Sequence, residues 1–187
     1  MTMSQLQLVL DNAVRASKED PMGYKNELQQ PGPFTLVSVA RRYIRQNASE
    51  GVDCPCCGRL VKEYRRKLNS GMAATLVWMV GKYLGPEGGG WIDVQRDAPK
   101  RVLRSRELGK LRHWGLVHQE TGKQASWAPT QRGVEFVTRK IRVQSHALIQ
   151  DNVCNGFSGE LISIDEALTE KFDYTELMQG RGFDEKG

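Results

Sequence analysis

Apolar residues recur every three or four positions in five stretches of the chain, which is the spacing of one face of an α-helix. The predicted helices are residues 3–16, 34–46, 69–83, 103–114 and 130–140. For residues 3–16 a strand-like start is the alternative. Asn69 precedes the third helix and Thr130 the last, and both residue types accept hydrogen bonds from free helix amides. The side chains expected to face the core from the fourth helix are Leu103, Leu108, Leu111 and Trp114.

Shorter apolar runs between turn residues predict strands. Residues 91–94 are expected to form one short strand, and residues 116–120 and 125–129 a hairpin around the turn TGKQ. Residues 95–102 have room for one short helical turn. Residues 69–140 are therefore predicted to run as helix, short strand, short helix, long helix, hairpin and helix, which makes the fold class α+β.

The C-terminal segment carries signals for two short helices. Ser163 and Glu166 have the spacing of a capping box for a helix over residues 165–171, and Asp173 with Glu176 is placed to open another. This segment is rich in apolar side chains for a chain end. It either packs on the body of the protein or docks in the groove of a partner as an acidic amphipathic segment.

Composition excludes several classes of protein. The 187 residues are 39% hydrophobic and 26% charged, which is typical of a soluble globular chain. We expect no membrane partner and a cytoplasmic location, because no apolar stretch approaches the ~20 residues of a membrane span and no basic segment opens a secretory signal. Phosphate-loop, dinucleotide and zinc-protease motifs are also missing, so an enzyme is not expected.

Positive charge is clustered along the chain rather than dispersed. Residues 59–67 carry five basic side chains and one acid, and residues 96–112 carry seven basic side chains and two acids. From Glu160 onward there are eight acids against three basic residues. A basic body with an acidic end favours a polyanionic partner. The alternative is that these charges only solvate the surface.

The stretch SRELGKLRHWGLVHQETGKQASWAPTQRGVEFV resembles the winged helix-turn-helix of bacterial regulators such as the MarR and PadR families. The resemblance covers about residues 69–140. It rests on the step WGLV after a leucine and on a W-x-x-T-x-x-G-x-x-F return into a helix, which here comprise Leu111, Trp114, Gly115, Leu116, Val117, Trp127, Thr130, Gly133 and Phe136. It implies a recognition helix over 103–114 and a glycine-tipped wing.

A recognition helix enters the major groove of double-stranded DNA, and the wing contacts phosphate or the minor groove. The predicted helix, the residues before it and the wing turn are basic. The residues expected to contact DNA are Lys100, Arg101, Arg104, Arg106, Lys110, Arg112 and Lys123. The motif CPCCG followed by KLNSGMA is similar to small uncharacterised bacteriophage proteins, which implies a phage origin and the cytoplasm of an infected host.

The turn DCPCCG carries the most distinctive chemistry. C-P-x-C-G is the pattern of a zinc knuckle, in which two thiolates three positions apart bind one ion. Cys54 and Cys57 are the predicted metal ligands of a structural zinc site, and Cys56 is the spare. The alternatives are reduced thiols in a tight turn and, more remotely, a redox pair.

A structural zinc site needs four ligands, and the chain lacks a second C-x-x-C. The candidates for completing the site are Cys56, His113, His118, His146 and Cys154. Residues 141–157 are predicted to form a hairpin turning at Asp151 and Asn152, and strand alternation then places His146 and Cys154 on opposite faces unless a bulge intervenes. The two therefore do not complete one site.

We expect four segments: an N-terminal helix and linker over 1–33, a helix with the knuckle over 34–68, a winged helix over 69–140, and a hairpin with an acidic end over 141–187. The favoured function is a DNA-binding phage regulator of transcription. The alternative is a phage factor that binds and modulates a host protein, with the winged helix as scaffold. A homodimer is also considered, because the apolar N-terminal helix offers a pairing surface.

Overall fold

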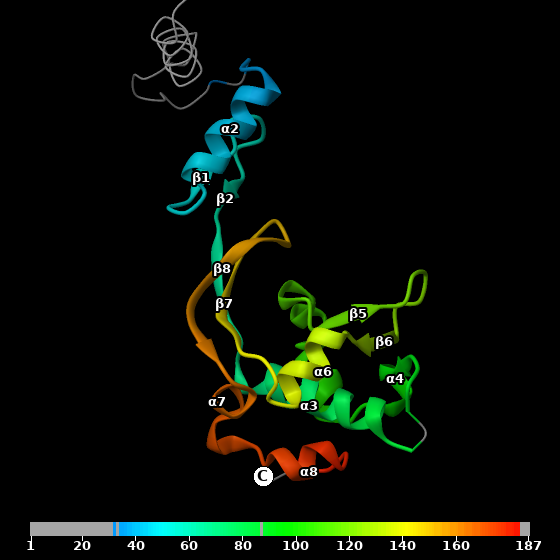
Figure 1. Ribbon diagram of the computed structural model, residues 1–187. Coiled ribbons are helices and arrows are strands. Elements are labelled where there is room, and N and C mark those ends of the chain that lie inside the picture. The colour runs from blue at the N-terminus through cyan, green and yellow to red at the C-terminus, as the bar shows by residue number, and fades with distance from the viewer. Residues whose placement is uncertain (1–31, 33, 87, 184–187) are drawn as a thin grey trace, which may run out of the picture. The chain divides into compact units, whose positions relative to one another are not determined.

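The computed structural model describes residues 32, 34–86 and 88–183, which form helices and small antiparallel sheets of the expected α+β class (Figure 1). The chain divides into two compact units, residues 1–62 and 63–187. The helix predicted over residues 3–16 lies outside the described residues.

The first unit contains helix α2 (Val37–Asn47) and a two-stranded hairpin of β1 (Val52–Asp53) and β2 (Leu60–Val61). The strands pair antiparallel, with Val52 opposite Val61. Helix α2 confirms the helix predicted over residues 34–46, although it begins three residues later, at Val37. Among the described residues of this unit, the buried apolar side chains are only Ala40, Ala48 and Val52.

Helix α3 (Ser70–Leu84) forms the centre of the second unit. The Asn69 carboxamide oxygen accepts a hydrogen bond from the Met72 amide at 2.9 Å, which confirms the predicted cap. Every residue from Met72 to Val80 is buried, so the helix is apolar on all faces and must be covered on all of them. Helix α6 (Gln131–Val137) and strand β6 (Ser126–Pro129) cover one part of it, and the C-terminal helices α7 (Ile164–Leu168) and α8 (Tyr174–Met178) cover another (Figure 1).

A three-stranded antiparallel sheet has the order β4-β6-β5. Its members are β4 (Ile92–Asp93), β5 (Val117–Gln119) and β6 (Ser126–Pro129), and the short helix α4 (Val94–Asp97) follows β4. The predicted strand and hairpin are thus confirmed, and the structure adds that β4 pairs with β6.

Helix α6 (Gln131–Val137) begins at the predicted cap. The Thr130 hydroxyl accepts a hydrogen bond from the Gly133 amide and donates one to the Gly115 carbonyl at 2.6 Å. Gly133 has no room for a side chain, because a Cβ there would overlap the Leu116 carbonyl. The helix ends at Val137, three residues before the predicted end at residue 140. Helix α6 is the last element of the region, residues 69–140, in which the sequence resembles a winged helix.

The prediction of one long helix over residues 103–114 is wrong. Helix α5 (Lys100–Ser105) ends at Arg106, which has a left-handed φ of 52°, and a 3₁₀ helix η1 (Leu108–Trp114) follows. Local hydrogen bonds replace the helical ladder at this break: the Ser105 hydroxyl donates to the Val102 carbonyl and accepts from the Glu107 amide.

The 3₁₀ geometry explains which side chains reach the core. Leu108, Leu111 and Trp114 are three residues apart, and a helix with three residues per turn stacks them on one face. The prediction that Leu103 faces the core is wrong, because Leu103 is 39% exposed and Val102 is buried in its place.

A second antiparallel sheet has the order β3-β7-β8, formed by β3 (Tyr64–Lys67), β7 (Val143–Gln150) and β8 (Val153–Ile162). The hairpin turns at Asp151 and Asn152 as predicted, and both have positive φ, at 47° and 62°. The Trp114 indole N–H donates to the Gln144 carbonyl at 2.7 Å, which ties η1 to β7.

The C-terminal segment packs on the body of the second unit. It contains α7 (Ile164–Leu168), the 3₁₀ helix η2 (Thr169–Lys171) and α8 (Tyr174–Met178), and the predicted capping box of Ser163 and Glu166 is formed. The apolar side chains that it buries are Ile164, Ala167, Leu168, Leu177 and Phe183. The packing alternative is therefore confirmed for the described part of this segment.

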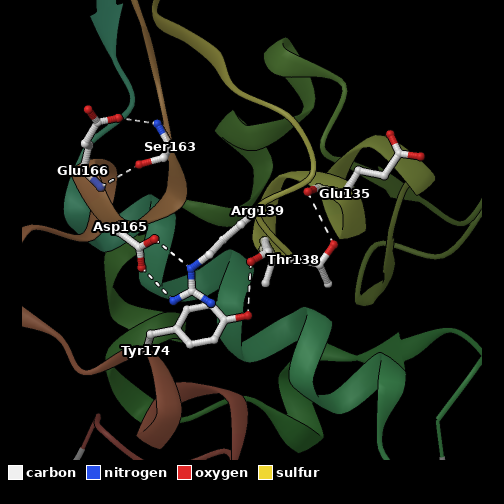
Figure 2. A network of polar contacts seen from close by, with 8 residues as sticks. Glu135, Thr138, Arg139, Ser163, Asp165, Glu166 and Tyr174 are labelled. Carbon is white, nitrogen blue, oxygen red and sulfur yellow. Dashed lines mark hydrogen bonds and ion pairs between the residues drawn. The ribbon is translucent and has the colours of Figure 1, made fainter.

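Polar contacts reinforce this packing (Figure 2). Arg139 forms an ion pair with Asp165 at 2.8 Å, and its guanidinium lies 4.0 Å from the centre of the Tyr174 ring. The Tyr174 hydroxyl donates to the Val137 carbonyl at 3.1 Å. Exposed ion pairs contribute little on their own, so the buried apolar side chains provide most of the attachment.

Replacing Gly81 by alanine is expected to destabilise the second unit by about 1–3 kcal/mol, because the new Cβ would overlap the Met178 carbonyl where α8 crosses α3. Gly71→Ala in the same helix is the matched control, since its Cβ would meet only Asn69 Oδ1 at 3.4 Å. Urea unfolding followed by tryptophan fluorescence compares the two. A Gly81→Ala chain as stable as the control would contradict the close packing of α8.

Candidate nucleic-acid interface and cysteine turn

The structure places the predicted DNA-binding residues on three parts of the second unit. Lys100, Arg101 and Arg104 lie on α5, Arg106 ends that helix, and the others lie on η1 and in the β5–β6 turn. Six of the seven side chains are exposed, and Lys110 is half-buried. The residues are therefore on the surface, but no single long helix presents them.

Ion pairs neutralise part of this charge. Lys110 pairs with Glu107 at 2.9 Å, and Lys123 pairs with Glu120 at 2.8 Å. Lys100, Arg101, Arg104, Arg106 and Arg112 form no ion pair within 4.0 Å among the residues that the structure describes. These five residues carry the uncompensated charge of the predicted set.

Arg101 has a different role from its neighbours. Its guanidinium lies 5.1 Å from the centre of the Phe172 ring, which belongs to the C-terminal segment. The contact holds the cation at the edge of a small pocket of about 240 Å³ that Lys171 also lines. A guanidinium stacked on an aromatic ring keeps its donors free for an anion.

The structure adds cationic residues that the predicted set did not contain. Arg65 and Lys67 lie two positions apart on the edge strand β3 and share one face of the sheet. They line a larger pocket of about 590 Å³ together with Lys171 and His146. Glu160 and Glu166 also line this pocket, and Glu166 is paired with Arg142.

The two pockets share Asn69, Ser70 and Lys171, so their cationic side chains belong to one surface. We call this the cationic surface; it comprises Arg65, Lys67, Lys171 and Arg101, which line the pockets, and we include Arg104 and Arg106, which lie on α5 and at its end without lining either pocket. The charge cluster in residues 59–67 was a signal for its β3 part. The β3 part lies next to α5 and η2 only because of tertiary packing, for which the sequence gives no local signal.

Histidines contribute little positive charge here. Burial lowers the pKa of His113, and the nearby Arg112 and Arg66 lower it further. Burial also lowers the pKa of His146, with smaller effects from Arg65 and Lys67. Both imidazoles are therefore neutral at pH 7, and the charge of the surface comes from arginine and lysine.

The cysteine turn joins β1 to β2 in the first unit. The Cys54 amide donates to the Arg59 carbonyl at 2.8 Å, and the Gly58 amide donates to the Cys54 carbonyl at 2.8 Å. Gly58 has a φ of +69°, the left-handed conformation that favours glycine. Backbone amides of Cys56 and then Cys57 hydrogen-bond the Cys54 sulfur and lower the pKa of its thiol.

These contacts are the arrangement a thiolate ligand requires, but the ligand set is incomplete. Within residues 32, 34–86 and 88–183, no three or more His, Cys, Asp or Glu side chains are gathered in a group that could hold a metal ion. Cys54 is half-buried, and Cys57 is exposed. Zinc binding by this pair remains a prediction.

The predicted separation of His146 and Cys154 is confirmed. Cys154 pairs with Ile149 across the hairpin, and β7 alternates regularly between buried and half-buried residues. His146 is three positions from Ile149 and so faces the other side. The register shifts twice, between Gln144 and His146 and between Leu148 and Ile149, but the extra residue is on β8 each time and does not change the parity along β7.

None of the helices in the described part of the chain is long and apolar enough to cross a membrane. Comparisons of the chain with protein-family models, with curated proteins and with solved structures found no match.

The low pKa of His113 predicts a loss of stability in acid. The unfolded chain takes up a proton near the ordinary pKa of ~6.5, whereas the folded state resists it, so stability falls as the pH drops below that value. Urea midpoints between pH 7.5 and 5.5 should fall less in His113→Gln than in the wild type. An NMR titration giving His113 an equal or higher pKa in the folded chain than in urea would contradict this account.

Proposed function

We propose that the second unit binds double-stranded DNA through the cationic surface, with Arg104 and Arg106 as its main phosphate contacts. The observation that carries this proposal is that both arginines are exposed and have no ion-pair partner among the described residues. Charges without local partners attract phosphate, and releasing the condensed counterions of DNA drives the association.

The support beneath these arginines is rigid. Val102 on α5 is buried, and the three core side chains of η1 lie just beyond the break at Arg106. The arginines therefore project from a backbone fixed on both sides. A fixed backbone reduces the conformational entropy lost on binding, because only the side chains need to be ordered.

The order of elements supports a domain of the winged-helix kind. Helix α3, strand β4, helix α4, the α5–η1 segment, the β5–β6 hairpin and helix α6 follow one another as the resemblance requires. The segment in the place of the recognition helix differs, because α5 has only six residues and is about 9 Å long. It contacts fewer base edges than a full helix, which shifts the binding energy toward phosphate contacts.

The resulting activity is DNA binding that depends steeply on salt and modestly on sequence. A role as a phage regulator of transcription rests on the resemblance. The alternative, a factor that docks on a host protein through its acidic C-terminal segment, has less support. Leu177 and Phe183 of that segment are buried, and Asp165 and Glu166 are already paired with Arg139 and Arg142.

The double charge reversal Arg104→Glu/Arg106→Glu is expected to weaken binding of a DNA duplex at least about tenfold. Fluorescence anisotropy of a labelled duplex at several salt concentrations measures it. Lys82→Glu/Lys140→Glu is the matched control, because it changes the net charge equally at exposed residues outside the cationic surface. The control should retain most of the affinity.

Neutral variants report on the contacts themselves. Arg104→Ala/Arg106→Ala should reduce the slope of log K against log salt by roughly one for each lost phosphate contact. Equal losses in the reversal and in its control would show that only net charge matters and would overturn the proposed surface. Wild-type affinity in both arginine variants, with unfolding midpoints unchanged, would also overturn it.

A further inference from the structure

The Cys54–Cys57 turn has the hydrogen bonding of a metal knuckle, in which the first and last residues supply two thiols. Its backbone is already closed by the amide contacts of Cys54 and Gly58, so metal binding needs no refolding of the turn. A structural zinc ion is held by four protein ligands in a tetrahedron. Two further ligands must therefore come from elsewhere.

The first unit does not contain them. Residues 1–62 include three cysteines, all between positions 54 and 57, and no histidine. Cys56 is the third thiol, but no group of three potential ligands gathers in the part of the chain that the structure describes. Even with Cys56, one ligand of the usual cysteine and histidine set would be missing.

The cysteine and histidines of the second unit are all engaged within that unit. The Cys154 thiol donates to the Gly156 carbonyl at 3.3 Å, and its side chain packs against the core. His146 Nδ1 is hydrogen-bonded to the buried Ser145 hydroxyl at 2.9 Å.

The other two histidines are held in place or surrounded by positive charge. The His118 ring makes an edge contact with Trp91, with 4.8 Å between ring centres. His113 is close enough to Arg112 and Arg66 for both to oppose its protonation, and the same positive field opposes a divalent cation. Recruiting Cys154, His146 or His118 would break a contact that the second unit already makes.

We propose that Cys54 and Cys57 are one half of a four-thiolate zinc site, and that the same two residues of a second copy of this chain complete it. A two-fold axis through the ion relates the halves, so each knuckle contributes identically. The resulting Cys₄ set satisfies tetrahedral zinc with ligands of the type it prefers.

The size of the first unit agrees with this assignment. Its described residues bury only Ala40, Ala48 and Val52, and α2 leaves Val37 and Val39 exposed. Small units with so little apolar burial generally need a metal or a second subunit for stability. A zinc-bridged pair supplies both. The proposal stands independently of DNA binding, although a dimer would bring two cationic surfaces to one duplex.

The test uses the full-length chain, stripped of metal and kept reduced with a phosphine, so that disulfide-linked dimers do not form. Zinc chloride is then added, mass is measured by light scattering on a sizing column, and zinc is measured by mass spectrometry. The expected result is a dimer that contains one zinc ion for each pair of chains and returns to monomer with a chelator. Cobalt in place of zinc should give the absorption of a four-thiolate site.

Variants assign the ligands. Cys54→Ser and Cys57→Ser should each abolish zinc-dependent dimerisation, whereas Cys154→Ser and Cys56→Ser are controls that should dimerise as the wild type does. One zinc ion bound per monomer would show that a single chain completes the site and would overturn the proposal. A dimer that forms without zinc, no zinc binding, or a loss of zinc in Cys154→Ser would also overturn it. Anisotropy with DNA remains a separate readout, so failure here leaves the proposed function intact.

Discussion

The second unit depends on the enclosure of helix α3. Nine consecutive residues, Met72 to Val80, are buried, and each large apolar side chain among them contributes about 1.5–3 kcal/mol when it leaves water. No single layer can cover a helix that is apolar on every face. The β4-β6-β5 sheet, η1, α6 and the C-terminal helices all meet it, and their arrangement around α3 fixes where the cationic side chains lie.

The same enclosure gives the C-terminal segment a structural role. Its acids made it a candidate for contacting a partner, but Leu177 and Phe183 are buried, and Arg101 stacks on Phe172. Lys171, in the same segment, lines both pockets of the cationic surface. A segment rich in acids thus helps to assemble a basic surface, although Glu160 and Glu166 also line the larger pocket, where Glu166 is paired with Arg142.

Features set by neighbouring residues could be predicted from the sequence. The caps at Asn69, Thr130 and Ser163 and the turn at Asp151–Asn152 are confirmed, since each depends on hydrogen bonds or backbone angles within four residues. The helix over 103–114 was not predictable in this way. Its apolar residues at 108, 111 and 114 suit a 3₁₀ helix as well as an α-helix, and the left-handed Arg106 has no sequence signal, because glycine or asparagine usually occupies such a position.

The gathering of Arg65, Lys67, Lys171 and Arg101 depends on contacts distant in sequence, which a pattern of spacings does not encode.

The proposed DNA binding depends on the particular residues of the cationic surface and not on net charge, which is only +5 for the whole chain. Backbone amide resonances recorded while a DNA duplex is added test this most directly. The account predicts that the largest shifts fall in residues 100–106, with further shifts at residues 65–67 and 171, and that added salt reverses them. Shifts confined to other regions, such as the exposed Trp91 and its neighbours, or no shifts at low salt, would contradict it.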